Sequence, residues 1–303
     1  YLPQGTIDTM KAFNVSQVNW VLSQIPLALT VSNSLTVQSG YPHTTIASVN
    51  LNGTANAIDT RSVLVNGTPA TWSAWQGTWT ASNVPLTPGI NRILVQSLDA
   101  NGVEFAETNV DVWYDDGSVQ AEGGTIAANT IWTAAGGPYS ITANLTIASG
   151  ATLTIQPGTT VYLGSGVKLT VANGGVLLAE GATNAPIRFT VLPGSGVSWS
   201  GLTINGAVGS PETRIAYADF EGNGNTCIEV AGGTLALDHA NFLTTTHQYV
   251  ALDSSSFLLS YCTFPSSTAP FELLHGTGGI KAGGRGIVRD CFFGTTTGYN
   301  DIM

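Results

Sequence analysis

Charged residues are scarce in this chain. Only 9% of its 303 residues are Asp, Glu, Lys or Arg, whereas typical soluble proteins contain about 25%. Nine basic residues stand against 19 acidic ones, which gives a net charge of −10 at pH 7. Nucleic-acid binding depends on clustered Lys and Arg that neutralise phosphates. The sequence contains no such cluster, and we therefore expect no nucleic acid as a partner.

Long apolar runs are also missing. No stretch approaches the roughly 20 apolar residues of a membrane-spanning helix. The first residues lack the basic and then apolar profile of a secretory signal. We therefore predict no membrane span and expect a chain that has been processed or excised. Hydrophobic residues still make up 43% of the sequence, which allows a sizeable core and excludes intrinsic disorder.

Cysteine is scarce as well. The three cysteines are too few for a disulfide scaffold, and none has the C-x-x-C spacing of a structural zinc site. Thr, Ser, Asn and Gly are abundant instead, and the 36 glycines separate short strands. This composition is typical of bacterial proteins outside the cell, and we predict an extracellular or cell-surface location.

One helix is predicted near the start of the chain. Between Ile7 and Ile25, apolar residues recur along one face at helical spacing. Thr6 can cap the first turn and Pro26 can end the helix. We therefore predict a helical segment over residues 1–28 and expect its apolar face to pack against the next domain.

The pattern changes to a period of two between residues 30 and 116. Short runs such as Ser62-Val63-Leu64-Val65 alternate with turn residues, and Asn66-Gly67 is a strong signal for a hairpin. About seven short strands in this length predict an Ig-like β-sandwich over residues 29–116.

A third pattern begins after the acidic segment Asp115-Asp116. Short β runs open every eight residues and are separated by Gly, Pro and Asn. Short strands with tight corners at a fixed period are typical of a solenoid. The residues that open these runs are Leu145, Leu153, Val161, Leu169 and Leu177.

Further along, similar segments recur at 22 residues. They are Tyr217-Ala218-Asp219-Phe220, His239-Ala240-Asn241-Phe242 and Tyr261-Cys262-Thr263-Phe264, and Arg289-Asp290-Cys291-Phe292-Phe293 continues the series after a seven-residue insertion. A coil of this length that stacks parallel strands predicts a right-handed parallel β-helix over residues 117–303. Equivalent side chains then form inward columns at about the 4.8 Å strand spacing. The predicted columns are Phe220, Phe242, Phe264 and Phe293, and beside them Ala218, Ala240, Cys262 and Cys291.

The fold class is therefore predicted as all-β, with an Ig-like β-sandwich, a parallel β-helix and one N-terminal α-helix. Cys262 and Cys291 become column neighbours in this arrangement. We predict that they pack as thiols, with a disulfide as the alternative, in which case Cys227 stays unpaired.

Three segments resemble known families. Met10-Lys11-Ala12 through Ser23-Gln24-Ile25-Pro26 resembles the last helix of CotH-type kinase-like domains, which often precede β modules. Val65-Asn66-Gly67 through Leu98-Asp99-Ala100-Asn101-Gly102 resembles the Ig-like modules of secreted bacterial proteins. Gly123-Gly124-Thr125-Ile126 through Pro186-Ile187-Arg188-Phe189-Thr190 resembles their parallel β-helix modules. These resemblances imply folds and transfer no active site.

Carboxylates on an outer face of a β-helix can act as acid and base in polysaccharide lyases and glycosidases. The candidates for such a role here are Asp219, Asp238 and the neighbouring His239, although a solvated outer face, with His239 as a neutral member of a ring column, is the simpler explanation. The 22-residue register places Asp219 in one column with Asn241 and places Asp238 in another with Ser260.

Two further groups are candidate binding sites. Trp72, Trp75 and Trp79 are candidates for a platform that stacks sugar rings, although the core of the sandwich or its hairpin is the preferred place for Trp72 and Trp79. Asp111, Asp115 and Asp116 can hold a calcium ion through their oxygens, with an acidic solvated linker as the simpler explanation.

Two functions are compatible with these patterns. The first is an extracellular structural or adhesive module that associates with other copies, or with a continuation of the polypeptide, at the C-terminal end of the β-helix. That expectation rests on Asp301-Ile302-Met303, where the sequence shows no polar cap. The alternative is a β-helix protein that binds or cleaves a polysaccharide.

Overall fold

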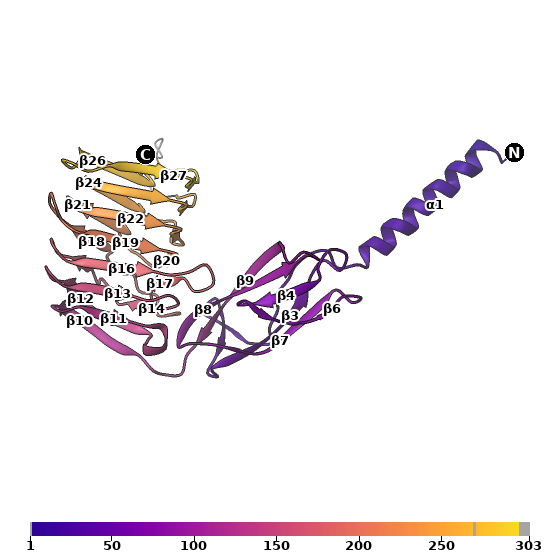
Figure 1. Ribbon diagram of the computed structural model, residues 1–303, viewed down its shortest axis with the longest axis horizontal. Helices are drawn as coiled ribbons and strands as arrows, with labels where there is room; N and C mark the ends of the chain where they lie inside the picture. The colour runs from indigo at the N-terminus through magenta and orange to yellow at the C-terminus, as the bar shows by residue number, and fades with distance from the viewer. Residues whose placement is uncertain (1, 269–270, 297–303) are drawn as a thin grey trace. The chain divides into compact units, whose positions relative to one another are not determined.

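The computed structural model describes residues 2–268 and 271–296, and strands dominate it (Figure 1). The chain forms two compact units. The first contains the chain up to Leu35, Ser48–Pro85 and Ile93–Val110, and the second contains Thr36–Ala47, Leu86–Arg92 and the described chain from Asp111 onward. The three predicted domains, 1–28, 29–116 and 117–303, divide the chain differently, and their boundaries stay a prediction. The proposed cap-free end at 301–303 lies outside the described residues.

The single helix described, α1, runs from Gln4 to Ser23. It begins after Pro3, whose carbonyl accepts the N–H groups of Thr6 and Ile7, so Thr6 lies inside the helix and does not cap it. None of its residues is buried. The expectation that an apolar face packs against the next domain is wrong, because large apolar side chains of the helix are exposed, such as that of Phe13 at 62%. No helix of the described residues is long and apolar enough to cross a membrane.

The strands before the solenoid form two sheets with alternating burial. One sheet has the order β1 (Val37–Gln38), β2 (Tyr41–Thr44), β9 (Glu104–Tyr114), β8 (Gly89–Leu98), β4 (Ser62–Val65) and β5 (Thr68–Pro69); the other has the order β3 (Ser48–Thr54), β7 (Thr78–Pro85) and β6 (Thr71–Ser73). Asn66 and Gly67 both have positive φ and join β4 to β5, as the hairpin signal predicted. The arrangement is a β-sandwich, and its assignment to the Ig-like class stays a prediction.

The rest of the described chain is a parallel β-helix, as predicted. Its strands lie above one another in Figure 1, from β10 to β27. They are β10 (Gln120–Ile126), β11 (Thr130–Trp132), β12 (Tyr139–Ile147), β13 (Thr152–Ile155), β14 (Thr160–Leu163), β15 (Leu169–Val171), β16 (Val176–Glu180), β17 (Ile187–Thr190), β18 (Leu202–Asn205), β19 (Glu212–Ala216), β20 (Ala218–Phe220), β21 (Ile228–Ala231), β22 (Thr234–Asp238), β23 (Asn241–Phe242), β24 (Val250–Ser260), β25 (Thr263–Phe264), β26 (Leu274–Ile280), β27 (Gly286–Arg289) and β28 (Phe292–Phe293), with a 3₁₀ turn at Ala134–Gly136.

The predicted inward columns are confirmed. Phe220 pairs with Phe242 in register, and Phe264 pairs with Phe293 across the insertion. The ring centroids of successive phenylalanines lie 5.4, 5.3 and 4.7 Å apart, and Phe189 extends the stack at 5.0 Å. The recurrence in the sequence therefore reflects a ladder in which each coil buries the ring of its neighbour.

The three cysteines are free thiols in the structure. Cys291 Sγ accepts the backbone N–H of Cys262 at 3.4 Å, so the two residues are column neighbours as predicted. Burial raises the pKa of Cys262 to about 12 and also raises that of Cys227. Both side chains pack in the core as small hydrophobic groups.

The phenylalanine ladder makes a direct stability prediction. Phe242→Ala removes a ring that stacks on both neighbours, and we expect the free energy of unfolding to fall by about 3–5 kcal/mol in chemical denaturation. Leu243→Ala is the matched control, since this adjacent side chain is exposed and should change stability by about 0.5 kcal/mol or less. Equal effects of the two substitutions would contradict the packing.

Candidate functional site: a groove on the β-helix

A recurring sharp corner of the β-helix places three ring side chains on its outside. Tyr217 is the single residue between β19 and β20, and His239 and Tyr261 follow β22 and β24 at the same corner of the next coils. Their φ angles are 46°, 48° and 53°. This left-handed conformation is uncommon for residues other than glycine, and it turns the chain sharply within one residue.

The three rings form an outer aromatic column. The His239 ring stacks on Tyr217 with centroids 4.3 Å apart and on Tyr261 at 4.9 Å. His239 Nδ1 lies 2.8 Å from Asp238 Oδ2, and Ser260 Oγ donates to Asp238 Oδ1 at 2.6 Å. The imidazole is thus fixed by two ring faces and one carboxylate. Tyr261 ends the column and is 50% exposed.

A polar ladder runs beside this column on the outer face of the next strands. Asp219 pairs with Asn241, and Asn241 pairs with Thr263, in successive coils. Asn241 Nδ2 donates to Asp219 Oδ1 at 2.8 Å. This bond orients the Asn241 amide and leaves its oxygen without a partner among the described residues.

Asp219 also belongs to a cluster of two arginines and two aspartates. Its Oδ2 lies 2.6 Å from Arg188 Nη1 and 3.1 Å from Arg92 Nη2. Asp111 binds both arginines as well, at 3.1 Å from Arg92 Nε and 2.6 Å from Arg188 Nη2. The Asp219 and Arg188 side chains are only 2% and 3% exposed. A charge removed from water to this degree depends on its partners, so the four side chains hold one another in place.

The surroundings of the cluster shift two pKa values. Burial alone lowers the pKa of Arg92, but Asp111 and Asp219 together raise it above its usual value. Burial, and then the nearby Glu221 carboxylate, raise the pKa of the Tyr41 phenol. Tyr41 donates to Glu221 Oε2 at 3.0 Å, and Thr190 donates to the same oxygen. Arg92 is therefore a permanent cation, and Tyr41 is a neutral donor.

The aromatic column and the polar ladder border a groove of 230 Å³. Its lining is Arg92, Ala182, Thr183, Pro186, Tyr217, Asp219, His239, Asn241, Tyr261 and Thr263. Besides the charged Arg92 and Asp219, the lining consists of small or apolar residues, three rings, one amide and two threonine hydroxyls. This combination of ring surface and neutral hydrogen-bonding groups suits a ligand that has both C–H faces and hydroxyls.

The structure places two of the three predicted acid and base candidates in this groove and the third in contact with one of them. Asp219 and His239 line it, and Asp238 binds His239. The cluster partners Arg92 and Arg188 were not predicted. Arg92 is 127 residues from Asp219, and no local motif indicates such a contact.

The tryptophan platform is not present as predicted. Trp79 is 1% exposed, and its indole N–H donates to the carbonyls of Thr30 and Thr54, so this side chain belongs to the core. Trp72 pairs with Trp79 across the strands and is half-buried, with a buried indole nitrogen. Only Trp75 presents its ring to solvent, at 85% exposed.

The three calcium candidates make separate contacts. Asp111 binds the two arginines, whereas Asp115 and Asp116 accept backbone N–H groups of Gly117 and Ser118 in local turns. Within the described ranges, no group of three or more His, Cys, Asp or Glu side chains is placed to hold a metal ion. Calcium binding by these aspartates stays a prediction without a formed site.

Comparison with known families adds one finding. Residues 124–244 match the family described as a pectate-lyase like beta helix domain. The match covers less than half of the chain and includes Tyr217, Asp219 and His239 of the groove. It agrees with the parallel β-helix seen in the structure. Searches of curated proteins and of solved structures returned no match.

The charge cluster predicts that losing a buried carboxylate lowers the free energy of unfolding much more than losing a half-exposed one. Asp219→Asn leaves the buried Arg188 with Asp111 as its remaining carboxylate, and we expect chemical denaturation to show a loss of about 3–5 kcal/mol. Glu180→Gln is the control, because it removes a half-exposed partner of Arg214 at 3.5 Å and should cost about 0–1 kcal/mol. A small effect of Asp219→Asn would show that the cluster does not hold the groove.

Proposed function

We propose that the β-helix binds a polysaccharide in the groove between the aromatic column and the polar ladder. The observation that carries the proposal is the lining of this groove, where partly or fully exposed rings repeat at the coil spacing and an amide and a hydroxyl follow Asp219 in the same register. A polymer with repeated rings and hydroxyls suits such a repeat. The match to a pectate-lyase like domain supports a role connected with polysaccharides, which favours the second of the two functions compatible with the sequence.

In this proposal, some side chains of the groove keep its shape and others contact the ligand. Arg92 and Arg188 are committed to Asp111 and Asp219, so they stiffen the groove rather than bind the ligand. The exposed ring of Tyr261 supplies a surface for C–H groups. The Asn241 amide oxygen and the Thr263 hydroxyl then bind sugar hydroxyls.

Cleavage of the bound polysaccharide is a second candidate function, and the Asp238–His239 pair favours it. An imidazole fixed by a carboxylate can transfer a proton at the groove. Asp219 is less suited to this role, because Asn241, Arg92 and Arg188 occupy both of its oxygens. If the protein is a lyase or a glycoside hydrolase, His239 is the residue we expect to act as the acid or base.

A polysaccharide ligand fits the predicted location outside the cell, where such polymers are found. The structural or adhesive function and the association of the C-terminal end with other copies stay predictions. Light scattering of the full chain tests them, since association predicts a mass that rises with concentration.

The binding proposal predicts retention on at least one immobilised polysaccharide of a panel that includes pectate, xylan, cellulose and mannan. Tyr261→Ala should weaken retention about tenfold, because stacking on a ring contributes about 0.5–1.5 kcal/mol beyond the buried area. Trp75→Ala is the control for loss of an exposed ring elsewhere. New reducing or unsaturated ends that disappear in His239→Ala would support cleavage. No retention of the unmodified chain, or equal retention of Tyr261→Ala, would overturn the proposal.

A further inference from the structure

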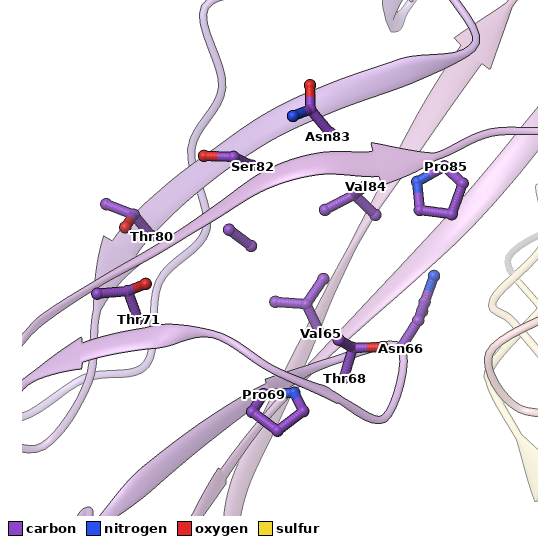
Figure 2. A pocket seen from close by; sticks show the side chains of 11 residues that line it. Val65, Asn66, Thr68, Pro69, Thr71, Thr80, Ser82, Asn83, Val84 and Pro85 are labelled. Atoms are coloured by element: carbon purple, nitrogen blue, oxygen red, sulfur yellow. The ribbon is translucent and has the colours of Figure 1, made fainter.

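The sandwich carries a second cavity, which is independent of the groove on the β-helix. Its volume is 330 Å³, and Figure 2 shows side chains that line it. The cavity lies between the β4–β5 hairpin and the strands β6 and β7. Its lining is Val65, Asn66, Thr68, Pro69, Thr71, Thr80, Ala81, Ser82, Asn83, Val84 and Pro85.

A β-bulge shapes one wall of the cavity. Val49 pairs with Val84 and Leu51 pairs with Ala81, so two residues of β7 lie opposite Asn50 alone. Asn50 Oδ1 accepts the backbone N–H of Asn83 at 2.8 Å, and Asn83 has a φ of 56°. A bulge of this kind redirects side chains and is often found beside a binding site. Here it places Ser82 and Asn83 along the cavity.

Most polar side chains of the cavity have polar atoms that form no hydrogen bond within the described protein. The hydroxyls of Thr68, Thr71, Thr80 and Ser82 and the side-chain amide of Asn83 have no hydrogen-bond partner among the described residues. The Asn66 amide is oriented, because its Oδ1 accepts the Leu94 N–H at 2.9 Å, which leaves Nδ2 as a free donor. Hydroxyls both donate and accept, so a complementary ligand needs groups that also do both.

The lining contains no charged side chain, although acidic residues outnumber basic ones in the chain. A charged ligand would find no opposite charge in this lining, most of which is exposed to solvent. Val65 and Val84 are the buried residues of the lining, and Pro69 and Pro85 add further apolar surface. The cavity therefore favours an uncharged ligand with C–H faces as well as hydroxyls.

An added peptide strand fits this place less well. The cavity lies between two edge strands, β5 and β6, and a peptide would have to pair with their backbones. However, β5 has two residues and β6 has three, and Pro69 in β5 has no N–H to donate. Short edges that contain proline resist strand addition.

We infer that this cavity is a binding site for an uncharged, hydroxyl-rich saccharide. The inference does not depend on the function proposed for the β-helix. The two sites together give the chain two attachment points for carbohydrate, which raises the avidity for a polymer that reaches both.

Calorimetric titration of the full chain tests the inference, with cellotetraose, mannotetraose and xylotetraose as neutral probes and tetragalacturonate as the charged one. Thr71→Val/Thr80→Val removes two hydroxyls that lie opposite each other across β6 and β7 and keeps side-chain shape and strand propensity. We expect it to weaken binding of a neutral probe at least tenfold. Thr108→Val in β9, outside the cavity, is the matched control and should leave binding unchanged.

The groove variant Tyr261→Ala separates this inference from the proposed function. Binding of a neutral probe that survives Tyr261→Ala and is lost in Thr71→Val/Thr80→Val supports the cavity, whatever the β-helix binds. The reverse result places the probe on the β-helix and overturns the inference. Absence of binding by all three neutral probes, or preference for tetragalacturonate, also overturns it.

Discussion

The register between successive coils is the constraint on which the rest of the β-helix depends. Each coil hydrogen-bonds to the next, so equivalent residues lie one strand spacing apart and side chains of one kind form columns. Inside the coils this produces the phenylalanine ladder, in which Phe220 stacks on Phe242 at 5.4 Å. Outside, the same register aligns Tyr217 with His239 and Asp219 with Asn241. The candidate groove is thus a product of the repeat that builds the core.

The groove also depends on groups that the repeat does not supply. Arg92 and Asp111 lie on β8 and β9, outside the solenoid strands, and they complete the charge cluster of Arg188 and Asp219. A buried ion pair adds little net stability compared with apolar packing, but losing one partner is costly. We interpret the cluster as fixing the position of Asp219, and through it the Asn241 amide that lines the groove.

Much of this fold follows from the sequence because a repeat is a local signal. The 22-residue spacing predicted the columns, including Phe264 with Phe293 across the insertion, and Asn66-Gly67 predicted a hairpin that the structure contains. The helix shows the limit of such patterns. Its apolar residues have helical spacing, but spacing cannot show whether a partner surface exists, and none of these residues is buried.

The sites were harder to predict than the fold. Sequence register separated Asp219 from Asp238; in the structure Asp219 lines the groove, and Asp238 contacts its His239 ring from behind the sharp corner. The contact of Arg92 with Asp219 spans 127 residues, and the hydroxyls of the sandwich cavity come from three threonines and one serine that form no distinctive motif. Long-range contacts bring the groove residues together, whereas the cavity lining comes from residues 65–85 alone and depends on how these short strands pack.

Hydrogen exchange of backbone amides, with and without a polysaccharide retained by the chain, tests the central claim most directly. The account predicts slower exchange on binding in three segments one coil apart, around residues 217–219, 239–241 and 261–263. Protection confined to other faces of the β-helix, or no change in these segments while the polymer is bound, would contradict it.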